Sequence, residues 1–216
     1  MVAPTSAASS YLLSPVVERL GFGPVTFTVA DTLDMVAQGI LPEDSSVELL
    51  NGVLVYRDRF DLKEGEIVAG AQHDFVVTAL SKLSLSIDND SRHLRTQATL
   101  VCSERHAPIP DAFVLRGGVR DYTDRLPAAS DAWCVIEVAG SSYERDAGEK
   151  LAGYARASIQ QYVIVNLNNR TAEIYTNPDP AAGTYAAPQV VHEGQSLSLR
   201  IGESEFFTFV LGGILP

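Results

Sequence analysis

The sequence predicts an α/β fold, with one mixed β-sheet and helices on its faces. Two long segments carry apolar residues at helical spacing, and short apolar runs typical of strands lie around them. The 216 residues are enough for one domain with a full core, and they show no internal repeat or clear linker. We therefore expect a single domain over residues 25–216, after an N-terminal extension over residues 1–24.

The N-terminal part predicts short elements and one hairpin. The dipeptide Asn51-Gly52 separates two apolar runs and favours a type I′ turn, which is a strong hairpin signal. Asp31 is placed to cap a short helix. The predicted elements are a helix at 16–20, a strand at 25–29, a helix at 32–37, and a hairpin of strands 47–50 and 53–56.

The rest of the chain alternates between helices and strands. Residues 70–87 predict one long helix, and residues 143–158 predict a second amphipathic helix. Asn168-Asn169 predicts a turn between two strands. The expected strands are 95–102, 112–115, 132–138, 162–167, 172–176, 190–191 and 197–201, with a polar loop over 117–130.

Composition excludes several classes of protein. No apolar run reaches the roughly 20 residues that a membrane span needs. Residues 1–10 contain no basic residue and make a poor signal peptide, so we expect a cytoplasmic protein with no membrane partner. Cys102 and Cys134 form no C-x-x-C pair, which argues against zinc and favours buried thiols. The net charge of −11 argues against a broad electrostatic grip on nucleic acid.

Four charged residues stand in segments that otherwise predict buried structure: Glu48, Asp111, Glu137 and Lys150. Asp111 opens the run Pro110-Asp111-Ala112-Phe113-Val114-Leu115 as the first residue of its strand, and Glu137 interrupts the strand at 132–138. A charge buried without a partner or a metal costs several kcal/mol. These residues therefore need a partner, and a divalent cation held by carboxylates would be one.

The two strand carboxylates predict a cation site. If their strands are neighbours, Asp111 and Glu137 converge at one end of the sheet, and such oxygen ligands suit Mg²⁺ or Mn²⁺. Lys150 lies at the edge of the apolar stripe of its helix, so a helix packed on the sheet would carry its ammonium towards these carboxylates. There it could orient or deprotonate a water and stabilise negative charge on a phosphate.

An ordered set of motifs carries a resemblance to a known family. They are Glu48-Leu49-Leu50-Asn51-Gly52, His73 at a helix start, Pro110-Asp111-Ala112-Phe113-Val114, Val135-Ile136-Glu137-Val138-Ala139-Gly140-Ser141-Ser142, Glu149-Lys150-Leu151-Ala152-Gly153-Tyr154-Ala155, and Tyr162-Val163-Ile164-Val165-Asn166-Leu167. Together they resemble the Uma-type restriction endonucleases, a branch of the PD-(D/E)xK nuclease superfamily. Each motif alone is weak, but the ordered set, over about residues 25–176, is specific.

The resemblance implies a restriction-endonuclease-like core and metal-dependent hydrolysis of phosphodiester bonds, with DNA as the expected nucleic acid. It implies Asp111 and Glu137 as metal ligands, the backbone carbonyl of Val138 as a third, Lys150 as the catalytic lysine and Glu48 as an additional acid. The superfamily's lysine usually follows the acid by two positions, where this chain has Ala139. The lysine has moved to the following helix, as is common in this branch.

Alternatives remain open for the single residues. Asp111 could be a turn residue after proline, Glu137 one half of a structural ion pair, Lys150 a solvated lysine and Glu48 a half-exposed carboxylate. His73 and Gln97 could belong to the site or be ordinary polar residues, and we assign them no role.

Two functions from different classes compete. The first is a Mg²⁺- or Mn²⁺-dependent endonuclease. It should be a homodimer or larger assembly because cutting both strands of a duplex usually takes two sites, with residues 1–24 and 177–216 as interface candidates. The second is an inactive nuclease fold kept as a nucleic-acid-binding or protein-binding module. The intact set of acids and lysine favours the first, and the net acidity mildly favours the second.

Overall fold

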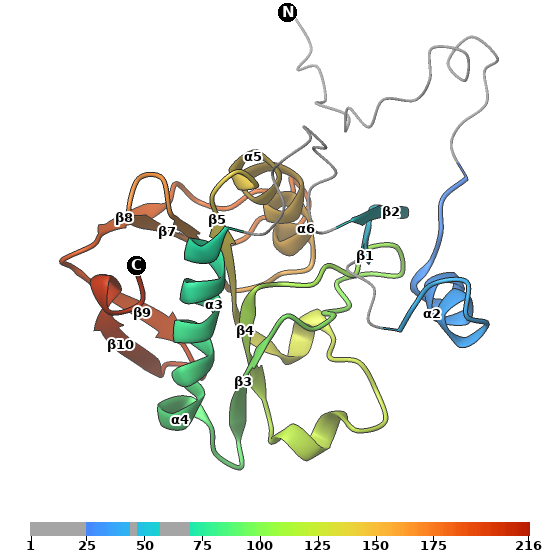
Figure 1. The fold of residues 1–216 in the computed structure, drawn as a ribbon, viewed down its shortest axis with the longest axis horizontal. Helices are drawn as coiled ribbons and strands as arrows, with labels where there is room; N and C mark the ends of the chain where they lie inside the picture. Colours follow the sequence, from blue (N-terminus) through green and yellow to red (C-terminus); the bar gives the residue numbers. More distant parts are fainter. Residues whose placement is uncertain (1–24, 44–46, 57–69) are drawn as a thin grey trace, which may run out of the picture.

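The computed structural model describes residues 25–43, 47–56 and 70–216. Its centre is a six-stranded sheet in the spatial order β3-β4-β5-β6-β7-β8 (Figure 1). Only β5 and β6 pair in parallel and the other neighbours are antiparallel, so the sheet is mixed as predicted. The strands are β3 (Arg92–Thr96), β4 (Ala112–Arg116), β5 (Ala132–Ala139), β6 (Gln161–Asn166), β7 (Thr171–Thr176) and β8 (Gln189–His192).

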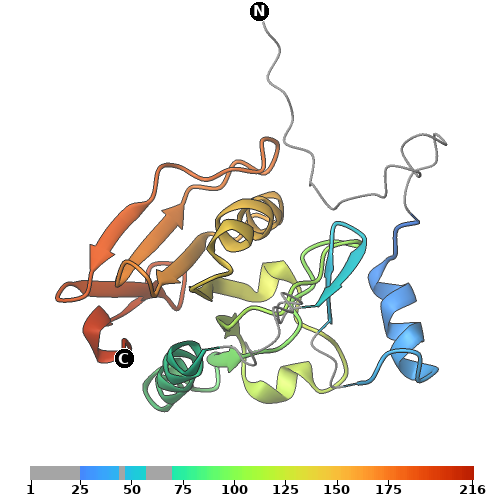
Figure 2. The same ribbon diagram turned by 45° about the horizontal axis from the view of Figure 1, so that its top comes forward.

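Helices cover both faces of the sheet, and each face has its own apolar core. The helix α3 (Ala71–Lys82) and the hairpin β9 (Ser196–Arg200) and β10 (Phe206–Val210) pack on one face. The helical segment 143–156 and the loops before β4 and β5 cover the other face. Figure 2 shows the two helical layers on opposite sides of the strands. Glu137 lies on the second face, between the core residues Val135 and Ala139 of β5.

The helix predicted over residues 70–87 is two helices, α3 and α4 (Ser84–Ile87). The ladder of hydrogen bonds tightens where α3 ends, because the N–H of Leu83 bonds to Leu80 O, three residues back. The serines at 84 and 86 are weak helix formers, so an interruption of the helix here costs little free energy. The prediction of one continuous helix was therefore wrong.

The second helical segment is also interrupted. It consists of α5 (Tyr143–Arg145), a π-helical turn η3 (Asp146–Lys150) and α6 (Leu151–Arg156). The prediction of a regular helix over 143–158 missed the π turn, and the helix ends earlier because Ser158 has a left-handed backbone (φ 61°). Such turns are rare, and they are frequently found at functional sites.

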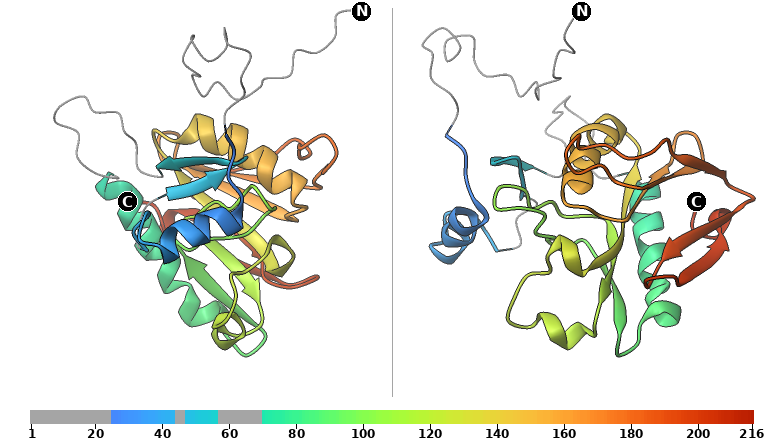
Figure 3. Two further views of the ribbon diagram at one scale, coloured as in Figure 1. Left: turned by 90° about the vertical axis from the view of Figure 1, so that its right-hand side faces the viewer. Right: turned by 180° about the vertical axis from the view of Figure 1, so that it is seen from behind.

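The predicted hairpin is present as β1 (Val47–Leu50) and β2 (Val53–Tyr56). Asn51 and Gly52 both have positive φ, as the type I′ turn requires. The turn at 103–107 holds the hairpin through hydrogen bonds with Leu49 and Gly52. Figure 3 shows the hairpin and α2 (Val29–Ala37) at one side of the molecule, with β9 and β10 at the other.

Several further boundaries differ from the predictions. Residues 25–28 form no strand: Thr28 and Asp31 make a capping box that starts α2 at Val29, so Asp31 is the third helical residue and not the cap. The strand predicted at 95–102 is β3, which ends at Thr96 because Gln97 takes φ 49° and turns the chain. Asp111 directly precedes β4 and is not its first residue.

Some elements of the fold were not among those predicted. The strand β10 was not predicted, although its alternation of half-buried and exposed residues is typical of a strand with one covered face. The 3₁₀ turns are η1 (Val119–Tyr122), η2 (Ala129–Asp131) and η4 (Leu211–Gly213). The helix predicted at 16–20 lies outside the described residues. None of the helices in the described part combines the length and the hydropathy that a membrane span requires.

Candidate active site

The adjacent strands β4 and β5 bring Asp111 and Glu137 to the same end of the sheet. Their antiparallel register pairs Ala112 with Ile136, so the residues just beyond this pair are Asp111 and Glu137. Asp111 is fixed by the backbone, because its Oδ2 accepts a hydrogen bond from Val138 N at 2.7 Å. Both side chains are buried, with relative exposures of 3% and 2%. The predicted adjacency of the two strands is confirmed.

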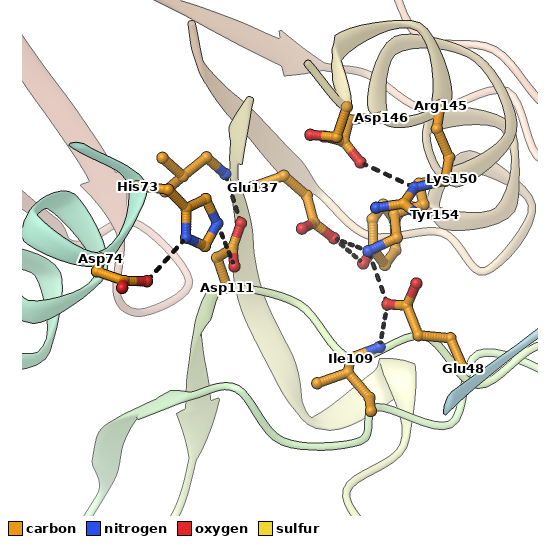
Figure 4. Close-up of polar contacts among 12 residues, drawn as sticks. Glu48, His73, Asp74, Ile109, Asp111, Glu137, Arg145, Asp146, Lys150 and Tyr154 are labelled. Carbon is orange, nitrogen blue, oxygen red and sulfur yellow. Dashed lines mark hydrogen bonds and ion pairs between the residues drawn. The ribbon is translucent and has the colours of Figure 1, made fainter. Parts of the chain in front are cut away.

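Lys150 points to Glu137 and not to solvent. Its Nζ lies 3.0 Å from Glu137 Oε1 and 2.7 Å from Glu48 Oε1, and the residue is 1% exposed (Figure 4). Lys150 is the last residue of the π turn, so this turn determines where the lysine leaves the helix. The expected orientation of Lys150 is confirmed, and the solvated alternative is excluded.

Glu48 reaches the site from the hairpin. Its Oε1 accepts hydrogen bonds from Ile109 N at 2.8 Å and from Lys150, while its Oε2 is buried without a hydrogen-bond partner among the described residues. The half-exposed alternative for Glu48 is therefore wrong, because the side chain is fully buried. A buried carboxylate oxygen without a donor is costly, and such an atom is a marker of a site that takes a further group.

The turn of the hairpin is attached to the helix that carries Lys150. Asn51 Nδ2 donates to Glu149 Oε1 at 3.0 Å, and Asn51 N donates to Nδ1 of the buried His106 at 3.3 Å. The imidazole of His106 also lies against Gly153 of α6. These contacts hold Glu48 and Lys150 in register, although 102 positions separate them in the chain.

The structure brings three further residues to the site. The hydroxyl of Tyr154 donates to Glu137 Oε1 at 2.7 Å, and His73 Nε2 lies 3.1 Å from Asp111 Oδ1. Asp146 is buried and accepts a hydrogen bond from Ser142 Oγ at 2.6 Å. Asp146 and Tyr154 lie four positions before and after Lys150, and this helical spacing was the signal that could have identified them. Gln97 is exposed, and its backbone N–H donates to Asp111 O.

The site contains more negative than positive charge. Three buried carboxylates, those of Glu137, Glu48 and Asp146, act on Lys150, and a fourth, that of Asp111, acts on Glu137. Burial raises the pKa of Glu137 to about 8; Lys150 opposes this shift, and the neighbouring carboxylates add to it. Burial also raises the pKa of Asp146.

The two hydrogen-bond donors of Glu137 stay protonated at neutral pH. Burial alone would lower the pKa of Lys150, but the carboxylates of Glu137 and Glu48 outweigh it and raise that pKa above its ordinary value. Burial raises the pKa of the Tyr154 hydroxyl well above its usual range. Both groups therefore remain donors to the same carboxylate oxygen.

The residues present fit a divalent cation by charge and by donor type. The carboxylates are hard oxygen donors, they outnumber the ammonium, and the second oxygen of Glu137 is turned to the side where Asp111 lies (Figure 4). The described residues contain no ready-made group of three His, Cys, Asp or Glu residues that could hold a metal. Further ligands would therefore have to be waters, substrate oxygens or a backbone carbonyl. That Val138 supplies its carbonyl stays a prediction; its N–H binds Asp111.

Comparisons with known proteins agree with this architecture. The chain resembles the crystal structure of "a putative nuclease belonging to DUF820 from Anabaena variabilis ATCC 29413", with a TM-score of 0.62 and 11% identity. The match covers 87% of this chain and 97% of that chain, and at this identity it shows a shared fold. A comparison with curated proteins found no match.

A family-level match covers most of the domain. Residues 37–207 match the family Uma2, whose description is "Putative restriction endonuclease". The matched range contains Glu48, Asp111, Glu137 and Lys150, and it both begins and ends later than the core of about residues 25–176 that the motifs suggested. The chain therefore belongs to the Uma2 family of restriction-endonuclease-like proteins.

Proposed function

We propose that this protein is a Mg²⁺- or Mn²⁺-dependent nuclease that hydrolyses phosphodiester bonds, with DNA as substrate. The observation that carries the proposal is the buried contact of the Lys150 ammonium with both Glu48 and Glu137, beside Asp111. A purely structural ion pair needs one acid for one base, whereas here several acids surround one lysine. The description of the family supports the nuclease class and DNA.

Each residue has a separate task in this proposal. Asp111 and Glu137 would hold the cation, which supplies Lewis-acid stabilisation of the phosphate oxygens and a more acidic bound water. Lys150 would orient the attacking water and stabilise the negative charge that develops on the phosphate. Glu48 keeps the ammonium at this place, because it binds both Lys150 and the backbone N–H of Ile109.

His73 would support the ligand Asp111. Its Nε2 contacts the Asp111 oxygen that does not bind Val138 N, so both carboxylate oxygens have a neighbour that fixes their direction. Outer partners of metal-binding carboxylates commonly orient them in this way. His73 is partly exposed, and we assign it no proton-transfer role.

The test is cleavage of plasmid DNA and single-stranded DNA with Mg²⁺ or Mn²⁺, compared with the metal-free protein. Lys150→Met should lower cleavage by on the order of 10²-fold or more, as the loss of a charge-stabilising group does. Lys82→Met changes a lysine of α3 outside the site and should leave cleavage unchanged. Glu137→Gln should also abolish metal-stimulated cleavage.

One result would favour the second function class. A folded wild-type protein that cuts neither substrate with either metal would be an inactive module, and the net charge of −11 mildly favours that class because it disfavours a nucleic-acid substrate. A protein that cuts equally well with and without Lys150 would contradict the proposed chemistry.

A further inference from the structure

Tyr154 is a buried tyrosine with its hydroxyl in the site. It lies one turn after Lys150 in α6 and is fully buried. Its ring packs against Tyr162, with ring centroids 4.9 Å apart, in an aromatic cluster that also contains Tyr175 and Tyr185. This packing fixes the ring, so the hydroxyl has one direction in which to donate.

The hydroxyl of Tyr154 and the ammonium of Lys150 bind the same oxygen of Glu137. The distances to Oε1 are 2.7 Å from the tyrosine and 3.0 Å from the lysine. No described residue donates to the other oxygen, Oε2, which points away from both donors and towards the side of Asp111 (Figure 4). The χ3 torsion of a glutamate has only a weak preference of its own, so the hydrogen-bond donors at Oε1 determine the direction in which Oε2 points.

We infer that Tyr154 is a positioning residue for Glu137: it holds Oε1 and so presents Oε2 to the cation. This inference rests on the proposed function, because it assigns Glu137 to the cation. Tyr154 is needed for this task because Lys150 has two roles. Its ammonium is shared between Glu137 and Glu48 and would also face the phosphate, whereas the single proton of the Tyr154 hydroxyl is donated to Glu137 alone.

The other tyrosines of the cluster show that a hydroxyl here does not need a site carboxylate as its partner. The hydroxyl of Tyr162 donates to the backbone oxygen of Asp146 at 2.9 Å, and that of Tyr185 to the backbone oxygen of Ile159 at 2.9 Å. A buried tyrosine hydroxyl requires some acceptor, and backbone carbonyls supply it at these two positions. Tyr162 is therefore a matched control, equally buried and in contact with Tyr154 but bonded elsewhere.

The experiment is titration of the full chain with Mn²⁺ by isothermal calorimetry in the absence of DNA. Tyr154→Phe should weaken Mn²⁺ binding by about 10- to 100-fold, the usual effect of removing a partner that orients a ligand. Tyr162→Phe should bind Mn²⁺ like the wild type. In cleavage assays, Tyr154→Phe should need more Mn²⁺ for half-maximal rate, and saturating Mn²⁺ should restore most of the rate.

A second comparison separates positioning from a general loss of packing. In a Glu137→Gln background, Tyr154→Phe should cause no further loss of Mn²⁺ affinity, because the tyrosine acts through Glu137. Equal Mn²⁺ affinity of the wild type and Tyr154→Phe would overturn this inference alone. An equal loss of Mn²⁺ affinity in Tyr154→Phe and Tyr162→Phe would also overturn this inference. A wild-type protein that binds no Mn²⁺ would overturn both this inference and the proposed function.

Discussion

Gly153 marks the place where α6 comes nearest to the turn that holds the hairpin. A Cβ atom at this position would lie 2.1 Å from His106 Nε2 and 2.5 Å from His106 Cε1. The imidazole cannot easily retreat, because it is buried and its Nδ1 accepts the hydrogen bond from Asn51 N. Gly153→Ala should therefore push the helix and the turn apart.

The cost can be estimated against a matched glycine. Overpacking a buried site costs roughly 1–3 kcal/mol. At Gly148, in the π turn of the same helical segment, a Cβ would meet nothing within 4 Å, and the gain from replacing a helical glycine is at most about 1 kcal/mol. Both glycines are helical and share this gain, so we expect Gly153→Ala to be less stable than Gly148→Ala by the overpacking cost alone, about 2 kcal/mol. In a chain of this size that corresponds to a difference in melting temperature of roughly 4–8 °C.

Urea unfolding followed by circular dichroism would measure the difference. Adding His106→Ala to Gly153→Ala should cost less than the sum of the two single changes, because it removes the atoms that the new methyl group would meet. Gly153→Ala should also reduce cleavage, since it disturbs the register between Lys150 and Glu48. If Gly153→Ala is as stable as Gly148→Ala, the close contact is not a constraint and the reasoning fails.

Three further outcomes are expected. Burial, with help from the charge of Lys150, lowers the pKa of His106 from 6.5 to about 4, so the unfolded chain binds a proton in this range that the folded chain does not. The free energy of unfolding should fall by about 3 kcal/mol between pH 7 and pH 4, and urea titrations of His106→Gln should lack this part of the loss. Millimolar Mg²⁺ or Mn²⁺ should raise the melting temperature, and this gain should shrink as the pH is lowered, because Glu137, whose pKa is raised, must lose its proton to bind the cation. Asp111→Asn should abolish the gain. Sedimentation at micromolar concentration should show a homodimer or larger assembly, and a strict monomer would contradict the proposed double-strand cutting.

The sequence alone predicted that Asp111, Glu137 and Lys150 lie close together. The apolar runs around Asp111 and Glu137 predicted two strands, and these strands are neighbours in the sheet. Lys150 was expected to point inwards from its place at the edge of an apolar stripe, and it does. These predictions succeeded because the pattern of apolar residues over a few consecutive positions is enough to predict which face of a strand or helix is buried.

Three features of the fold and of the site were not predicted, each for a different reason. A period of 3.6 residues cannot indicate a π turn, so the interruption over residues 146–150 was missed. His73 and Tyr154 join the site through Asp111 and Glu137, which are distant in sequence. At the N-terminus, Thr28 and Asp31 both have side chains that can cap a helix, and only their mutual hydrogen bonds show which residue begins it.

The hairpin that carries Glu48 has consequences for the motion of the protein. Asp111 directly precedes β4 and Glu137 lies in β5, two interior strands of a six-stranded sheet, whereas β1 and β2 form a two-stranded sheet of their own. A pair of strands is marginal alone, so this unit depends on the turn at 103–107 and on Asn51. Segments with few supporting contacts open at a lower free energy than the core. Local opening of the hairpin would therefore separate Glu48 from Lys150 while the rest of the domain stays folded. The larger the fraction of molecules with an open hairpin, the lower the activity would be.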